Sequence, residues 1–206
     1  MNPILRRRVL RACAALPLAA WLPPPASAQP YDLDVPPPTP PQAAAIETLL
    51  AGAQAAGGIQ DGHSAHRLYV FYDPNCPYCH RLYDDLRPYV VRGAVQVAWI
   101  TVGYLAPSSL TKAAAILQAR DPLAALRRNE RDYAAPGAGH GGGGIAPATT
   151  VTPATRARLQ RNQQMLRAIH ALGVPLAVWR GRDGEARMMF GEIPRKQLRE
   201  LVALLA

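Results

Sequence analysis

The pattern of apolar and polar positions predicts a strand, a helix and a second strand near the middle of the chain. The segment "RLYVFY" (67–72) is β-branched and aromatic, which is typical of a buried strand. "HRLYDDLRPYVV" (80–91) has the apolar spacing of a helix, which Pro88 should kink or end. "AVQVAWITV" (94–102) alternates as a second strand. We therefore expect a strand–helix–strand unit here.

The second half of the chain predicts a helical insertion, a hairpin and a closing helix. The insertion, about residues 104–172, contains helical stretches and a low-complexity glycine loop, "APGAGHGGGGIAP". "VPLAVWR" (174–180) and "EARMMF" (185–190) are typical of strands joined by a turn, and a helix follows at 194–206. This order predicts an α/β fold, with a mixed four-stranded sheet flanked by helices.

The first residues have a different pattern. Residues 1–28 have the three parts of a secretory signal peptide: a basic cluster, an apolar run too short to span a bilayer and a small-residue cleavage site. An uncleaved membrane anchor is the alternative. Residues 29–42 carry six prolines and predict a semi-rigid linker. Residues 43–65 predict a linker helix and a loop, and 66–206 the main domain. The mature protein is expected outside the cytoplasm.

Charge gives little further information about partners. Removal of the predicted signal peptide, which has four arginines and no acidic residue, would lower the formal net charge from +9 to +5. The remaining arginines have the spacing of solvated helix faces, without the interleaved aromatic residues that bind single strands. We expect no nucleic-acid partner.

The candidate chemistry lies in Cys76-Pro77-Tyr78-Cys79, which contains the only two cysteines left after removal of the predicted signal peptide. Such a pair can exchange disulfides, hold a metal or, because His80 follows, attach a c-type haem. Zinc would need four ligands, and only these three side chains are clustered in the sequence. The haem alternative fits the motif, but a strand leading directly into the cysteines is not typical of a cytochrome.

Disulfide exchange fits the predicted elements best. A reactive cysteine must be acidic and accessible, and a helix N-terminus stabilises the thiolate of Cys76 through the helix dipole and unpaired N–H groups. Pro77 suits the first helical position. Cys79, one turn further, could attack a mixed disulfide formed at Cys76. We therefore predict that Cys76 is the nucleophile and Cys79 the resolving thiol.

Several segments together resemble a known family. "FYDPNCPYCHRLYDDLRPYV", "VQVAWITVGYLAPSSLTKAAAIL", "GVPLAVW" and "GEIPRKQLRELVALL" are similar to the thioredoxin-fold domain of periplasmic DsbC/DsbG thiol:disulfide interchange proteins, with Pro-Tyr between the cysteines as in DsbG. The resemblance covers roughly residues 45 to 206. It implies a thioredoxin-like fold and a cis peptide bond before Pro175, where the backbone of Val174 can pair with an extended substrate.

Three departures from the family qualify what the resemblance implies. No N-terminal dimerisation domain is visible before the linker helix, so we expect a monomer. Val174 stands where DsbG-like proteins tend to have threonine, which resembles the DsbA oxidases. Val70 stands where many thioredoxin-fold enzymes bury a carboxylate, so proton transfer to Cys79 needs water or another group. The nearer Asp73 is expected to form a turn with Pro74.

The sequence therefore predicts a periplasmic thiol:disulfide oxidoreductase or isomerase, with the direction of exchange left open. Its substrates would be cysteine-containing periplasmic proteins, and a DsbD-like or DsbB-like membrane protein would recycle it. The redox-active pair needs no cofactor and no metal. Tyr78 is expected to tune the thiolate and touch substrate, whereas His80 is expected to be solvated.

Overall fold

The computed structural model describes residues 38–134, 142–171 and 173–205. The predicted signal peptide (1–28) and most of the predicted proline-rich linker (29–42) lie outside these residues, as does part of the glycine loop. No helix among the described residues is both long and apolar enough to cross a membrane.

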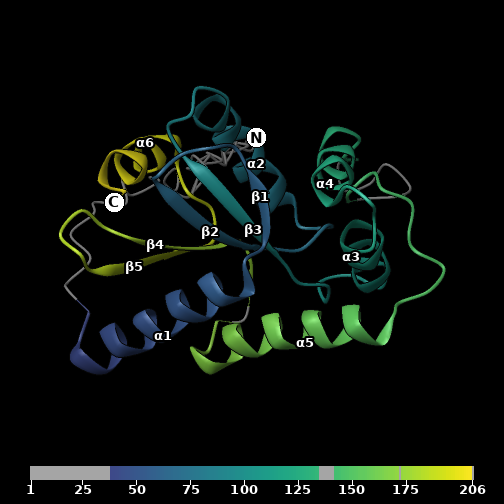
Figure 1. Ribbon diagram of the computed structural model, residues 1–206, viewed down its shortest axis with the longest axis horizontal. Coiled ribbons are helices and arrows are strands. Elements are labelled where there is room, and N and C mark those ends of the chain that lie inside the picture. Colours follow the sequence, from purple (N-terminus) through teal and green to yellow (C-terminus); the bar gives the residue numbers. More distant parts are fainter. Residues whose placement is uncertain (1–37, 135–141, 172, 206) are drawn as a thin grey trace, which may run out of the picture. The chain divides into compact units, whose positions relative to one another are not determined.

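A mixed sheet forms the centre of the fold, with strand order β1-β3-β2-β4-β5 (Figure 1). β2 (Arg67–Tyr72) is parallel to β3 (Gln96–Thr101) and antiparallel to β4 (Leu176–Arg180), which pairs in turn with β5 (Ala186–Phe190). These are the four predicted strands, at nearly the predicted positions. The central strand β2 is buried along almost its whole length, as its apolar run predicts.

The prediction of four strands is wrong by one. A fifth strand, β1 (Ile59–Asp61), pairs antiparallel with β3 at the edge of the sheet, where we expected a loop. Three residues between glycines are too few to show alternation, so the pairing depends on tertiary contacts. Asp61 is fully buried and accepts hydrogen bonds from Arg87 and Arg127, which attach the edge strand to two helices.

Helices cover both faces of the sheet (Figure 1). α1 (Pro40–Ala56) and α5 (Pro153–Ala168) lie on one face, and α2 (Pro77–Val91) and α6 (Arg195–Leu204) on the other. Thr152 caps α5 by accepting a hydrogen bond from Thr155 N. α2 does not end at Pro88 but continues to Val91, with this proline inside the helix.

The predicted insertion supplies two more helices besides α5. α3 (Ser109–Leu117) and α4 (Pro122–Arg131) pack against each other, and α4 also contacts β1. Asp121 caps α4 through Ala124 N. The contact between Glu130 of α4 and His80 of α2 places the end of α4 close to the first turn of α2.

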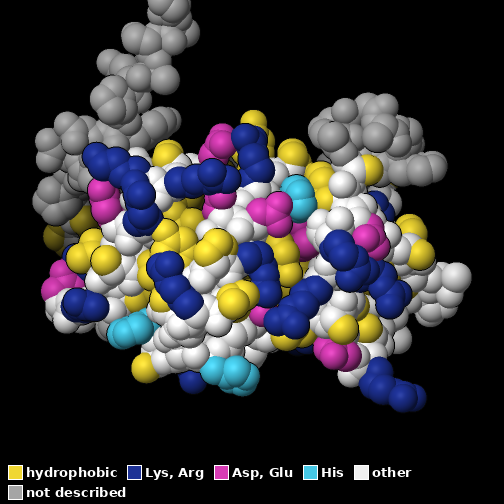
Figure 2. Space-filling view, turned by 90° about the horizontal axis from the view of Figure 1, so that it is seen from above, with side chains coloured by type: hydrophobic (Ala, Val, Ile, Leu, Met, Phe, Trp, Pro, Cys, Tyr) yellow, Lys and Arg dark blue, Asp and Glu magenta, His cyan; other side chains and the backbone are white. Residues whose placement is uncertain are grey.

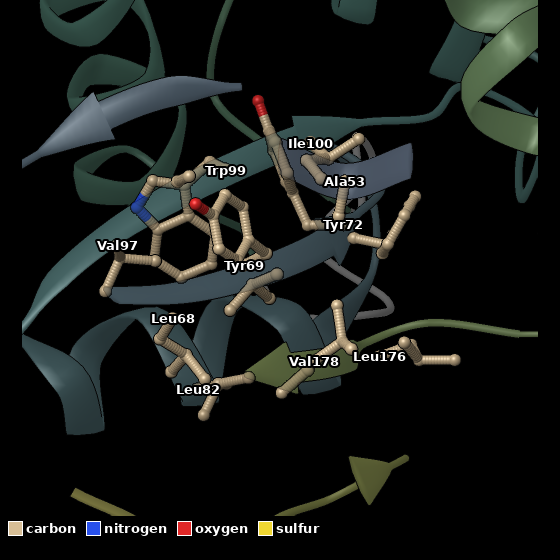
Figure 3. Packing of buried hydrophobic residues seen from close by; sticks show 14 of the residues in the cluster. Ala53, Leu68, Tyr69, Tyr72, Leu82, Val97, Trp99, Ile100, Leu176 and Val178 are labelled. Carbon is tan, nitrogen blue, oxygen red and sulfur yellow. The ribbon is translucent and has the colours of Figure 1, made fainter. Parts of the chain in front are cut away.

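The core between the layers is rich in aromatic residues. Tyr72 and Trp99 lie on one face of the sheet (Figure 3), where their rings meet edge to face with centroids 5.7 Å apart. Tyr69, three residues before Tyr72 on β2, points to the other face. α1 contributes Leu50 and Ala53, both fully buried, to the same core. The helix expected as a linker therefore packs as one layer of the fold.

Candidate redox site

The two cysteines lie at the start of α2, where the sequence pattern predicted them. Cys76 is the N-cap residue and Pro77 takes the first helical position. The Cys76 sulfur accepts a hydrogen bond from Cys79 N at 3.3 Å, so an otherwise unpaired N–H of the first turn points at it. Both cysteines are free thiols, and each is only 2% exposed.

The environments of the two sulfurs differ in a way that separates their roles. The pKa of Cys76 is lowered, mainly by a hydrogen bond from the Cys79 thiol and also by the N–H groups of Cys79 and Tyr78. Burial raises the pKa of Cys79, and its hydrogen bond to Cys76 raises it further. The first cysteine therefore forms the thiolate more readily, which suits a nucleophile, and the second stays protonated.

The loop before β4 completes the surroundings of Cys76. The peptide bond between Val174 and Pro175 is cis, as the family resemblance implies. The Cys76 sulfur lies 3.3 Å from the carbonyl oxygen of Val174, to which its thiol can donate. Of the predicted site residues, the structure brings together Cys76, Cys79 and Val174.

Tyr78 faces solvent at the edge of this group. Its side chain is 46% exposed, and the guanidinium of Arg81 lies over its ring, 4.7 Å from the centroid. Arg81 in turn pairs with Glu192. An exposed aromatic ring next to a reactive thiol is available to a substrate, and its predicted contact with substrate stays a prediction.

The expectation that His80 is solvated is wrong. Its Nδ1 lies 3.1 Å from Glu130 Oε2, and its ring stacks on Tyr133 with centroids 4.2 Å apart. Glu130, at the end of α4, is only 3% exposed and also accepts a hydrogen bond from Asn129. Because α4 is fifty residues away in the chain, helical spacing within α2 gave no sign of this partner.

Glu130 also acts electrostatically on Cys79, the predicted resolving thiol. Its negative charge contributes to the raised pKa of Cys79, which places a buried carboxylate within electrostatic reach of that sulfur. Val70, where a carboxylate is usual in related folds, is fully buried in β2. The acidic group near the site therefore comes from a different element from the one that the family pattern indicates.

Asp73 has a larger role than the turn expected of it. It does accept a hydrogen bond from Asn75 N, which closes the turn. It also accepts hydrogen bonds from Ser109 Oγ at 2.6 Å, from Tyr104 N at 2.8 Å and from Leu105 N at 3.1 Å. A single buried carboxylate thus fixes the segment before Cys76 to the loop after β3.

Lys112 and its partners form a second group of buried polar residues, which the sequence pattern did not predict. The buried amine of Lys112 donates to Asn75 Oδ1 at 2.9 Å and to Gly143 O at 2.6 Å. Gly143 N donates to Pro74 O, and Tyr133 donates to Asn75 O. Asn75, directly before Cys76, is therefore bonded to α3 and to the segment after α4, and Pro74 is bonded to the glycine loop.

The His80–Glu130 pair predicts a pH-dependent contribution to stability. Glu130 raises the pKa of His80 above its ordinary value of 6.5, and Asp84, 3.6 Å away, adds to the effect. Since folding favours the protonated form, this stabilisation is complete below the ordinary pKa and is lost as the pH rises through the raised value. We expect the destabilisation caused by Glu130→Gln to be about 0.5 kcal/mol larger near pH 6 than near pH 9, because His80 is partly exposed.

Urea unfolding of both proteins at the two pH values measures this difference. In a His80→Asn background, Glu130→Gln should lower the free energy of unfolding by the same amount at both pH values. An equal effect of Glu130→Gln at both values with His80 present would contradict the pairing.

The two alternatives to disulfide exchange, haem attachment and a metal site, would use the same side chains, Cys76, Cys79 and His80. His80, the iron ligand of the haem alternative, has its Nδ1 bonded to Glu130. Among the described residues, no group of three or more His, Cys, Asp or Glu side chains is arranged to hold a metal ion.

Comparison by sequence finds two DsbG proteins. The chain is 32% identical over 146 residues to the thiol:disulfide interchange protein DsbG of Pseudomonas aeruginosa, an alignment that covers 70% of this chain and 54% of that protein. It is 43% identical over 63 residues to DsbG of Escherichia coli, covering 31% of this chain and 25% of that one. The alignments thus span about half or less of these relatives. No family model matches the chain.

Comparison by structure finds the same fold. The catalytic domain of Proteus mirabilis ScsC superposes with a TM-score of 0.60 at 19% identity, over 78% of this chain and 96% of that one. The thiol-disulfide exchange protein α-DsbA2 of Wolbachia pipientis superposes with a TM-score of 0.56 at 15% identity, over 78% and 94%. The chain is therefore similar to DsbG over most of its own length and has the thioredoxin-like fold.

Proposed function

We propose that the chain is a thiol:disulfide oxidoreductase that exchanges disulfides with cysteine-containing protein substrates. The observation that carries the proposal is the difference between the two thiols of one C-x-x-C pair. Cys76, with a lowered pKa, caps α2 beside the Val174 carbonyl, while Cys79 is buried with a raised pKa. Similarity to DsbG supports the same chemistry.

The reaction begins with the Cys76 thiolate. It attacks one sulfur of a substrate disulfide, forming the Cys76 mixed disulfide, and the other substrate sulfur leaves as a thiolate that takes up a proton. In this proposal, backbone groups of the Val174–Pro175 segment pair with an extended substrate strand, and the contact of the Val174 carbonyl oxygen with the Cys76 sulfur supports this role.

Resolution needs the proton to leave Cys79. The Cys79 thiolate then attacks the Cys76 sulfur, the Cys76–Cys79 disulfide forms and the substrate is released as a dithiol. Glu130, whose charge acts on Cys79 and which is bonded to His80, is the group that we propose takes up this proton. Reversal of the same steps oxidises a substrate, and return of the mixed disulfide to another substrate thiol isomerises it.

We further propose that the protein works in the periplasm without a cofactor. The pair itself carries two electrons per cycle, so a membrane protein of the DsbD or DsbB kind would restore its redox state. Similarity to DsbG and the fold shared with a periplasmic thioredoxin-like protein of Salmonella enterica support this location.

Equilibration with glutathione redox buffers tests the function. After acid quenching and alkylation with a mass tag, the purified protein should show a single two-electron transition between a form with two tags and a form with none. Peptide mapping should place the disulfide between Cys76 and Cys79. Absence of this disulfide at every buffer ratio, or a Soret absorbance band with thiols that never accept the tag, would refute the proposal.

A further inference from the structure

Helix α5 has an unusual distribution of charge. It carries four arginines and no acidic residue: Arg156, Arg158, Arg161 and Arg167. Among the residues that the structure describes, none of these four forms an ion pair. The guanidinium groups of this helix are thus not neutralised by their neighbours.

The opposite face of the molecule is different. There, acidic and basic side chains lie interspersed (Figure 2). Arg81 of α2 pairs with Glu192, and Arg195 of α6 pairs with Asp85 of α2. Within the described part of the chain, unpaired basic residues also occur there, such as Lys196 and Arg199 of α6, but α6 carries the acidic residue Glu200 as well, whereas α5 has four unpaired arginines and no acidic residue.

One face of α5 forms a continuous row of long polar side chains, which we call the α5 stripe: Arg156, Gln160, Gln163 and Arg167. Their spacing of four, three and four residues places them along the same side of the helix. From first to last the stripe is about 16 Å long, at a rise of about 1.5 Å per residue. It offers hydrogen-bond donors throughout and no carboxylate.

The stripe ends at a cavity of about 230 Å³. Gln163 and Arg167 of the stripe line it, together with Leu166, Ala171 and Tyr104. Leu166 and Ala171 make the wall partly apolar, and the 38% exposed ring of Tyr104 forms its opposite side. The cavity can take one large side chain.

Tyr104 connects this cavity to the redox pair. Asp73, three residues before Cys76, accepts a hydrogen bond from Tyr104 N at 2.8 Å. Burial raises the pKa of Tyr104 to about 12, the charges of Cys79 and Cys76 add to the rise, and Arg167 opposes it. The Tyr104 ring therefore lies within electrostatic reach of both the cysteines and the end of the stripe.

We propose that the α5 stripe and the Tyr104 cavity bind an acidic segment of the polypeptide substrate, next to the cysteine that reacts with Cys76. This inference rests on the proposed function and names its substrate class. Unpaired arginines attract carboxylates, and the two glutamines donate to them as well. An extended segment of about five residues matches the length of the stripe. Polypeptide is favoured over other polyanions because the stripe leads to a thiol that reacts with disulfides.

Three disulfide substrates test the proposal: an acidic peptide, a lysine-rich peptide of equal length, and neutral hydroxyethyl disulfide. Rate constants for oxidation of the reduced protein are measured by acid quench and alkylation. We expect the acidic peptide to react about tenfold faster than the basic one at about 0.05 M salt, and the preference to disappear near 1 M salt. Dividing each rate constant by that for hydroxyethyl disulfide cancels changes in the redox pair itself.

Matched variants locate the effect. The change Arg156→Gln with Arg167→Gln should remove most of the acidic preference, whereas Lys196→Gln with Arg199→Gln on α6 changes the net charge equally and should keep it. The inference is overturned if wild type shows no preference, if both double variants lose it equally, or if an oligonucleotide or an anionic vesicle binds the stripe while acidic peptides do not. Failure of wild type to react with hydroxyethyl disulfide would instead refute the proposed function, and the inference with it.

Discussion

Cys76→Ala is expected to abolish disulfide exchange with protein substrates, lowering the rate constant by about 10³-fold or more. The remaining thiol cannot replace it, because burial raises the pKa of Cys79 and keeps this thiol protonated. The rate of reduction of a disulfide-bonded polypeptide measures the loss. Circular dichroism should show an unchanged fold, since alanine removes only one sulfur from the start of α2.

Cys79→Ala should have the opposite signature. The variant still attacks through Cys76 but cannot resolve the product, so a covalent adduct with the substrate accumulates and is visible by mass spectrometry under non-reducing conditions. The rate of the first attack should also fall, because the Cys79 thiol is the largest contribution to the lowered pKa of Cys76. Adducts formed by Cys76→Ala in place of Cys79→Ala would reverse the assigned roles.

Asp73→Ala is expected to lower the free energy of unfolding by about 4 kcal/mol, because it leaves four hydrogen-bond donors without an acceptor. Those donors are Asn75 N, Ser109 Oγ, Tyr104 N and Leu105 N, and the carboxylate that they share is 1% exposed. Loss of the carboxylate therefore loosens both the turn before Cys76 and the loop after β3. Urea unfolding followed by circular dichroism measures the change.

Ser109→Ala provides the matched control for this experiment. It removes one of the four donors and leaves Asp73 with three, but Ser109 Oγ also accepts hydrogen bonds from Asn75 Nδ2 and Ala106 N, so we expect a loss of about 2 kcal/mol. If Asp73→Ala costs no more than Ser109→Ala, the carboxylate does not hold the two segments together. In that case the turn and the loop are fixed by their apolar contacts.

The parts of the fold that are visible in the sequence are those with a local pattern. The apolar run of β2 and the alternation of β3 predicted their strands, and the position of Cys76 as N-cap with Pro77 after it follows from strand, turn and helix signals in direct succession. The cis bond before Pro175 came from family resemblance. Local spacing is enough where each residue acts through its own element.

The parts that the sequence did not reveal are those made by tertiary contact. β1 is an edge strand that is held by pairing with β3 and by the two arginines that contact Asp61. Neither kind of contact produces a periodic pattern in the sequence. Glu130 and Lys112 lie in an ordinary helical pattern, and only the packing of α3 and α4 turns them toward His80 and Asn75. Buried polar groups in such networks are specified by their partners, which are distant in the chain.

The close contacts of Gly142 and Gly143 limit which substitutions the glycine loop can accept. A Cβ at Gly142 would collide with the side-chain amide of Asn75, and one at Gly143 would collide with that of Asn129. Gly142 also has a φ of +113°, which disfavours any other residue. A side chain at Gly142 would therefore push on Asn75, the residue before Cys76, and one at Gly143 would push on Asn129, which donates a hydrogen bond to Pro74 O. Selection on the redox chemistry would therefore act on what looks, in sequence, like a spacer.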